Sequence, residues 1–485
     1  MSLAKKAITG IIWNFAEQLA RRGIGVAVTL LLAYFLTPED FGLVAMMAVF
    51  LALGGTLMAS GFQQALIRLK EATQLDFNTA FYANIALGLV AYIILYNAAP
   101  RIALFYEQPD LVSLIRVAAL AVIVNSLQVV QVSILSRQLN FKAQLKANLP
   151  AALLSGLLAV SLAYYGWGAW ALVVQMLVSA ILITVFLWMQ RIWRPSLSFC
   201  FTSLGHMYNF GYKLFLSGVL DIVFKNMYVI VLAKVFSSSV AGIYFFAEKI
   251  KELVISQLVT SIQTVTYPAL STMQDDDVRL KVGYRKVLAM TTFLMFPTML
   301  FLAALSQPLF EFLLPKKWWP AVEYLQLMTL AGLLIPLHSI NLNILKIKGR
   351  SDIFLYLEII KKIMSALIFF VSIDYGVTGI LIGQIISSVL SYIPNSYFSK
   401  RLIGYSVRQQ LTDFLPGLVS SAVIAGFIFS LQAWVQWWAL AELVVFGLLA
   451  GLMYLLSANL LKLHAYELTK ELVLKKFKKV KPKGE

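Results

Sequence analysis

Apolar stretches of about twenty residues recur along the whole chain, and they restrict its fold more than any other feature. A helix needs about 20 residues to cross the hydrocarbon core of a membrane. It also pairs its own backbone N–H and C=O groups, for which lipid offers no partners. The 485 residues are 60% hydrophobic and 13% charged, whereas soluble domains contain about 25% charged residues. The sequence therefore predicts an all-α polytopic membrane protein.

We expect about fourteen transmembrane helices, because short polar segments divide the apolar stretches. The expected spans lie near residues 9–36, 41–66, 77–99, 111–134, 147–165, 168–190, 209–236, 240–262, 286–306, 322–345, 354–373, 376–398, 411–432 and 437–461.

The formal net charge of +17 would indicate nucleic-acid binding in a soluble protein. In this chain the charges follow the positive-inside rule instead. If the N-terminus lies in the cytoplasm, the external loops contain only Arg101, Lys316 and Lys317 of the 40 Lys and Arg residues. The basic stretch at 475–483 then either lies against the anionic cytoplasmic leaflet or is simply solvated. We expect both termini in the cytoplasm and no nucleic-acid partner.

Two distant segments of the chain resemble each other. LLAYFLTPEDFGL at 31–43 and VLAKVFSSSVAGI at 231–243 each join the end of one span to the start of the next, and they share Gly42 and Gly242 at equivalent positions. An even number of spans in each repeat predicts parallel halves, related by an axis along the membrane normal. We therefore predict two pseudo-symmetric six-helix lobes around a central cleft. The expected domains are an N-lobe at 1–200, a C-lobe at 201–405, two additional spans at 406–461 and a basic cytoplasmic tail at 462–485.

The first span of each predicted lobe contains an acid and a base one helical turn apart: Glu17 with Arg21, and Asp221 with Lys225. A charge at the bilayer centre costs at least about 2.5–3.5 kcal/mol, so such residues should face a bundle interior or an aqueous cavity. One interpretation is that each acid neutralises its base within one helix. The other is a cavity that receives an anion, and the surplus of bases over acids favours it. The predicted cation-lined site consists of Arg21, Arg22, Lys225, Lys249 and Lys251. The carboxylates predicted for ion coupling are Glu17, Asp221 and Glu248.

Small and polar residues fill the second expected span, ALGGTLMASGFQQ at 52–64. Small residues favour close helix packing. Alternatively, Gln63 and Gln64 face the cavity as sugar contacts. In later spans Pro297 and Pro336 each remove a helical hydrogen bond, which predicts kinks.

No motif typical of a catalytic or metal site occurs in the sequence, because the P-loop, GxSxG and HExxH patterns are all absent. Cys200 is the only cysteine and the three histidines lie far apart, so no metal site is predicted. We interpret the acidic run at 275–277 as a solvated loop. We therefore expect a protein that is not an enzyme and has no cofactor, driven by an H⁺ or Na⁺ gradient.

Four segments of the chain resemble a known family: TPEDFGLVAMM (37–47), GFQQALIRLKE (61–71), YPALSTMQDDDVRLKVGYRKVL (267–288) and LPKKWWPAVEYLQLM (314–328). By these segments, the chain resembles the polysaccharide transport branch of the multidrug/oligosaccharidyl-lipid/polysaccharide exporter superfamily. Within this branch it is most similar to Wzx-type flippases of the colanic acid exporter group.

The resemblance implies two six-helix lobes that form a V-shaped cleft in the bacterial inner (plasma) membrane. It implies transport of undecaprenyl-diphosphate-linked oligosaccharide repeat units by alternating access, for exopolysaccharide or O-antigen-type lipopolysaccharide. The polymerase and glycosyltransferases of the same pathway are the implied partners. Related flippases line the cleft with basic residues from the first two spans of each lobe, and Arg21, Arg22, Lys225 and Lys249 occupy comparable spans here. The second span carries no charge and departs from this pattern.

Three other functions stay open on the sequence alone. An efflux antiporter for cationic drugs belongs to the same superfamily, but its cavity should be acidic or aromatic. A membrane-embedded sugar transferase or polymerase would need a larger extramembranous segment. A structural scaffold would not account for charges placed inside the membrane.

Overall fold

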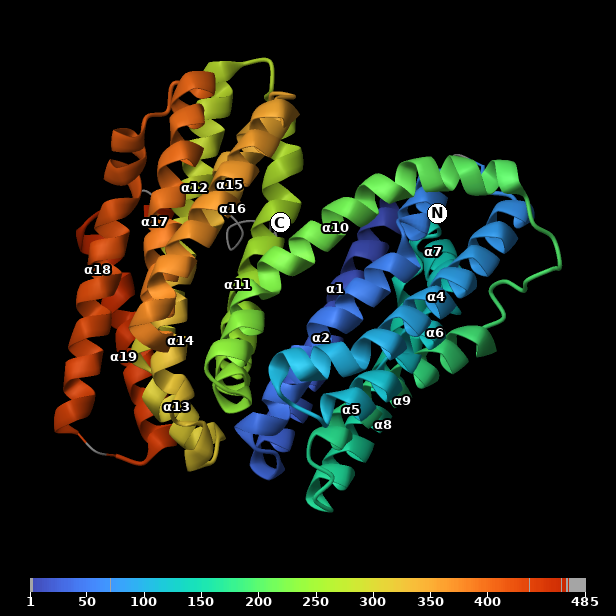
Figure 1. Cartoon of the computed structure of the whole chain (residues 1–485). Coiled ribbons are helices and arrows are strands. Elements are labelled where there is room, and N and C mark those ends of the chain that lie inside the picture. Colours follow the sequence, from blue (N-terminus) through green and yellow to red (C-terminus); the bar gives the residue numbers. More distant parts are fainter. Residues whose placement is uncertain (1–2, 70, 436, 464, 468–469, 471–485) are drawn as a thin grey trace, which may run out of the picture. The chain divides into compact units, whose positions relative to one another are not determined.

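Helices connected by short turns make up the described part of this chain, and the computed structural model contains no strand there. The structure describes residues 3–69, 71–435, 437–463, 465–467 and 470. They fall into two compact units, residues 1–245 and 246–485, each of which is described by itself (Figure 1). The lobe boundaries expected from the sequence repeat stay a prediction.

The first unit is built around long helices that pack side by side. It contains α1 (Leu3–Phe35), α2 (Pro38–Ala59), α3 (Phe62–Arg68), α4 (Gln74–Tyr106), α5 (Leu111–Ala118), α6 (Leu120–Ser126), α7 (Val129–Arg137), α8 (Phe141–Tyr164), α9 (Ala169–Met189), α10 (Phe201–Val235) and the start of α11 (Ser238–Ser271). Helix α8 packs along both α1 and α9, whereas α10 packs against α2, α3 and α4. A buried cluster that includes Phe62, Phe81 and Trp193 joins α3 and α4 to the segment after α9.

The second unit is centred on α12, which packs against α14, α15 and α18. It contains the rest of α11, α12 (Asp277–Ala304), α13 (Ser306–Leu313), η1 (Lys316–Trp318), α14 (Ala321–Gly332), α15 (Ile335–Ile347), α16 (Ser351–Ser372), η2 (Ile373–Tyr375), α17 (Gly376–Ile403), α18 (Val407–Trp434) and α19 (Ala439–Leu460). Figure 1 shows α18 and α19, coloured in the red part of the bar, running beside each other.

By length and composition, the described residues include 10 apolar helices that can cross a membrane, or up to 11 if one bent pair is counted as a single span. The prediction of a polytopic α-helical membrane protein is therefore confirmed. The number fourteen stays a prediction, since the first predicted span lies partly among residues whose side chains are not described.

The expected span at 111–134 is not one straight helix, which corrects the sequence-based prediction. The chain breaks after Ala118 and again near Leu127, where the two parts are bent by 43°. Side chains of α9 pair with carbonyl groups beside the second break: Thr184 donates to the carbonyl of Val124 at 3.3 Å, and Trp188 donates to that of Leu127 at 3.0 Å. A broken helix is tolerated in a membrane when neighbouring groups satisfy its backbone in this way.

The two prolines singled out from the sequence behave differently. Pro336 lies in the first turn of α15, where its missing N–H is unimportant, and it follows the break between α14 and α15. Helix α12, by contrast, continues from Asp277 to Ala304 through Pro297.

A capping box fixes the turn between α1 and α2. The Thr37 side chain accepts from the backbone N–H of Asp40 at 3.2 Å, and the Asp40 carboxylate accepts from the N–H of Thr37 at 2.8 Å. Each interaction satisfies an N–H group that the start of a helix leaves unpaired. The segment TPED therefore both ends one span and starts the next, as its sequence predicts.

The first turns of α2 and α11 touch each other through two glycines. A Cβ atom at Gly42 would lie 1.9 Å from the carbonyl oxygen of Ser238, and one at Gly242 would lie 1.8 Å from the carbonyl oxygen of Pro38. In the sequence repeat, Pro38 corresponds to Ser238 as Gly42 corresponds to Gly242. The contact is therefore reciprocal, as it is between two surfaces related by a two-fold axis. This reciprocity supports the predicted repeat.

We predict that Gly42→Ala and Gly242→Ala each destabilise the protein by at least about 1–3 kcal/mol, because an added methyl group would force two backbones apart. The apparent melting temperature of the purified protein measures the effect. Gly55→Ala is the control, since a Cβ there meets nothing within 4 Å. Equal melting temperatures for all three variants would contradict the close approach of the two turns.

Candidate functional site

The predicted site residues divide between the two units, and each set is described within its own unit. In the first unit Glu17 is buried between α1 and α8, with only 7% of its surface exposed. The side-chain amide of Asn148 on α8 donates to its Oε1 at 2.8 Å. Arg22 is half-buried, and the side chain of Arg21 lies outside the described residues. Glu17 is therefore held by a neighbouring helix, a partner that sequence spacing within α1 did not indicate.

Asp221 and Lys225 are exposed residues of α10, the helix that packs against α2, α3 and α4. The expected span at 41–66 breaks between α2 and α3, where Ser60 and Gly61 both have positive φ. Gln63 and Gln64, the candidate sugar contacts, follow this break on the short helix α3. Gln63 is half-buried and Gln64 is exposed.

In the second unit, Lys251 is balanced within its own helix. Its Nζ lies 3.6 Å from Glu248 Oε1, one turn away on α11, and the two side chains are 13% and 24% exposed. Lys361 pairs in the same way with Glu358 on α16 at 2.5 Å. Lys249 is exposed on α11. Lys251 therefore agrees with the first interpretation of these charges, in which an acid neutralises a base within one helix.

A buried polar network joins α12, α15, α17 and α18, and it was not identified from the sequence. Gln410 Oε1 accepts from the Tyr392 hydroxyl at 2.6 Å and from Asn341 Nδ2 at 3.4 Å. Asn341 Oδ1 in turn accepts from the hydroxyls of Tyr284 and Ser399, at 2.6 and 2.5 Å. Buried polar groups in such a network hold helices in one arrangement because each unmade bond is costly.

The network reaches an ion pair near the start of α18. Gln410 Nε2 donates to the carbonyl of Tyr405 at 3.3 Å, and the Tyr405 hydroxyl donates to Asp413 at 2.5 Å. Arg285 of α12 holds the same carboxylate with two bonds of 2.6 and 2.8 Å. Burial raises the pKa of Tyr405, so its hydroxyl stays protonated and continues to donate. Polar residues inside apolar spans were the available signal for this network.

Among the described residues, no group of three or more His, Cys, Asp or Glu side chains could hold a metal ion. The roles predicted for the ionisable residues stay predictions.

Comparison with known proteins decides the family. The model of a family described as "Polysaccharide biosynthesis protein" matches residues 31–323, which is more than half of the chain. The chain belongs to this polysaccharide biosynthesis family.

Sequence alignments with related proteins cover most of this chain. The lipopolysaccharide biosynthesis protein WzxC of Escherichia coli K12 is 27% identical over 429 residues, which cover 87% of this chain and 86% of WzxC. The succinoglycan biosynthesis transport protein ExoT of Rhizobium meliloti (strain 1021) is 24% identical over 437 residues, which cover 88% of this chain and 86% of ExoT.

Solved structures show which fold the family member adopts. The lipid II flippase MurJ in an inward closed conformation matches with a TM-score of 0.76 and 16% identity, over 93% of this chain and 98% of MurJ. An inward-facing multidrug resistance transporter of the MATE family matches with a TM-score of 0.59 and 16% identity, over 80% of this chain and 96% of that transporter. At these identities the likeness shows the fold alone. The family match and the named relatives confirm the predicted resemblance to Wzx-type polysaccharide transport proteins.

We predict that Gln410→Leu lowers the stability of the protein by about 2 kcal/mol or more. The change leaves the Tyr392 hydroxyl and the Tyr405 carbonyl without this partner, and each unmade buried bond costs about 1–3 kcal/mol. The apparent melting temperature in detergent measures the loss. Gln307→Leu is the control, because within the described residues the Gln307 side chain bonds only to an exposed neighbour, Glu311. A melting temperature for Gln410→Leu equal to that of the control would contradict the network.

Proposed function

We propose that this protein is a Wzx-type flippase, which moves undecaprenyl-diphosphate-linked oligosaccharides across the bacterial inner membrane for surface polysaccharide synthesis. The observation that carries the proposal is its likeness along nearly the whole chain to the fold of a lipid II flippase, in a member of a polysaccharide biosynthesis family. The relatives named for lipopolysaccharide biosynthesis and succinoglycan transport support the same class of substrate.

The cationic residues suit the diphosphate of such a substrate. A guanidinium offers a planar fork of donors to phosphate oxygens, and charge-assisted bonds of this kind are strong where water is partly excluded. We assign the five cations of the predicted site to this headgroup during transport: Arg21, Arg22, Lys225, Lys249 and Lys251. Gln63 and Gln64 are the proposed sugar contacts. The polyprenyl chain stays in the bilayer while the headgroup crosses.

Ion coupling is assigned to the carboxylates, with Glu17 as the first choice. Glu17 is buried and bonded to Asn148 of another helix, so a change in its protonation would alter how α1 meets α8. Asp221 is exposed on α10, and Glu248 is already paired with Lys251. The polymerase and glycosyltransferases of the pathway are the proposed partners.

The fold is shared with multidrug transporters, so the fold does not distinguish a flippase from an efflux antiporter. Family membership and the surplus of cations over acids favour an anionic substrate. A sugar transferase is not favoured, because the named relatives include a transport protein.

Thiol labelling tests the proposed topology, with both termini in the cytoplasm. In a Cys200→Ser background, we predict that Tyr165→Cys reacts with a membrane-impermeant maleimide in intact cells. Leu197→Cys should react only after the membrane is opened. Both side chains are strongly exposed, 76% and 98%, so access differs only by membrane side. Labelling of Leu197→Cys in intact cells would reverse the topology.

Loss of the gene should abolish surface polysaccharide and leave the lipid-linked intermediate in the cytoplasmic leaflet. We predict that wild type restores export, whereas the double variant Glu17→Gln/Arg21→Met and the single variant Lys225→Met reduce it at least about tenfold. Glutamine and methionine are close in size to the residues that they replace, and removing charge from a span does not oppose insertion, so membrane insertion should be retained. Surface polysaccharide per unit of inserted protein is the measurement.

Lys213→Met is the matched control for Lys225→Met, because both lysines are exposed on α10. Normal export from the double variant and from Lys225→Met would show that these charges are structural pairs. Accumulation of a drug, with normal polysaccharide, in cells that lack the gene would favour the efflux antiporter.

A further inference from the structure

Two adjoining cavities in the second unit form one amphipathic site beside α18. The larger is an apolar groove of about 660 Å³ between α18 and α19, and the smaller is a polar cavity of about 370 Å³ that also includes residues of α12. Thr412, Pro416 and Leu461 line both cavities. From these observations we propose that the groove and the cavity bind one anionic glycerophospholipid, with an acyl chain in the groove and the phosphate in the cavity.

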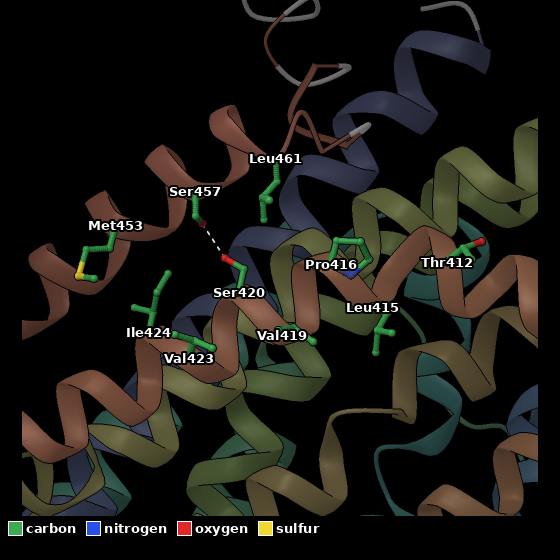
Figure 2. Close-up of a pocket in the computed structure, with 10 residues that line it drawn as sticks. All are labelled: Thr412, Leu415, Pro416, Val419, Ser420, Val423, Ile424, Met453, Ser457 and Leu461. Atoms are coloured by element: carbon green, nitrogen blue, oxygen red, sulfur yellow. Dashed lines mark hydrogen bonds between the residues drawn. The ribbon is translucent and has the colours of Figure 1, made fainter.

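The groove has the shape and lining for an acyl chain. It follows α18 from Thr412 to Ile424, which is about 18 Å at ~1.5 Å per residue. One leaflet of a bilayer is about 15 Å of hydrocarbon deep. Figure 2 shows Ser420 and Ser457 pointing toward each other from α18 and α19, and their hydroxyls are 2.6 Å apart. Because these hydroxyls bond to each other, the groove presents a hydrocarbon surface.

The polar cavity carries a surplus of positive charge. Arg285, Lys286 and Lys462 line it together with one acid, Asp413, which is held by Arg285. Within the described part of the chain, Lys286 and Lys462 have no ion-pair partner, and both are exposed. A phosphate that binds here would interact with two cations, and near a membrane surface each of them attracts anionic lipid.

The backbone places Lys462 over this cavity at a position that favours glycine. Lys462 has φ +48° just after α19, where the N–H of Leu463 bonds to the carbonyl of Ala458 at 3.0 Å. This is the Schellman ending of a helix, in which the left-handed residue is usually glycine. The chain thus has a cationic side chain at a strained position beside the cavity.

The occupant is a glycerophospholipid rather than the transported substrate, because the groove is only about one leaflet deep. An undecaprenyl chain is far longer than this groove. The proposal therefore does not rest on the proposed function, and loss of this lipid would not by itself identify the cargo.

Native mass spectrometry of the purified full-length protein tests the site. The protein is titrated with phosphatidylglycerol, with phosphatidylcholine of the same acyl chains, and with undecaprenyl phosphate. We predict about tenfold tighter retention of phosphatidylglycerol than of phosphatidylcholine by wild type. The double variant Lys286→Gln/Lys462→Asn should remove this difference, and asparagine tolerates the left-handed backbone. Lys400→Gln/Arg408→Gln is the control, since it removes two exposed charges outside the cavity.

Val419→Trp tests the groove without changing charge. It should reduce retention of both phospholipids several-fold, whereas Val444→Trp on α19 should not. The two valines are equally exposed, 50% and 49%, but only Val419 lines the groove. Equal retention of the two phospholipids by wild type would overturn the proposal. The proposal would also be overturned if the cavity and groove variants lost retention of undecaprenyl phosphate but kept retention of phosphatidylglycerol. If the double variant fails to insert, the single variant Lys286→Gln is used to compare the retention of phosphatidylglycerol with that of phosphatidylcholine.

Discussion

Close approach of backbones at glycine residues is the interaction on which the first unit depends. Helix α2 is approached in this way near both of its ends, by α11 at its start and by α10 just beyond its last residue. At one end, Gly42 and Gly242 bring the two turns together, and at the other a Cβ at Gly211 would lie 2.0 Å from the carbonyl oxygen of Ser60. Lipid supplies no hydrophobic force between helices, so close packing through small residues must hold them. Asp221 and Lys225 lie between these two contacts and take their positions from them.

The second unit depends instead on buried polar bonds. Gln410 joins α18 to α15 and α17, while Asp413 joins α18 to Arg285 of α12. These bonds also fix the wall of the groove and the polar cavity, because Thr412 and Pro416 belong to the same stretch of α18. Helix α18, the first of the two C-terminal helices that the sequence repeat left as an addition to the lobes, is thus fixed to the unit by specific side chains.

Local signals in the sequence predicted the helical membrane fold, and contacts between distant residues account for what was missed. Thr37 and Asp40 cap the start of α2 within four residues, so that turn is readable from the sequence alone. The breaks at Gly61 and Leu127 interrupt apolar runs without a proline, and the second is stabilised by Thr184 and Trp188 from a helix about sixty residues away. Asn148 was missed as the partner of Glu17 for the same reason, since α1 and α8 pair only in the folded chain.

The ion pairs within single helices and the proposed anion site are compatible. A carrier must tolerate its charges when no substrate is bound, and an unpaired charge in a membrane costs several kcal/mol. Glu248 balances Lys251 one turn away, and Glu358 balances Lys361 in the same way. A diphosphate carries more negative charge than a single carboxylate, so it attracts a lysine ammonium more strongly than the acid one turn away does. Of these bases only Lys251 belongs to the predicted cation-lined site, and we infer that Glu248 holds it while the site is empty and releases it to the substrate. The same pairing that makes the charges stable in the membrane then makes them available for transport.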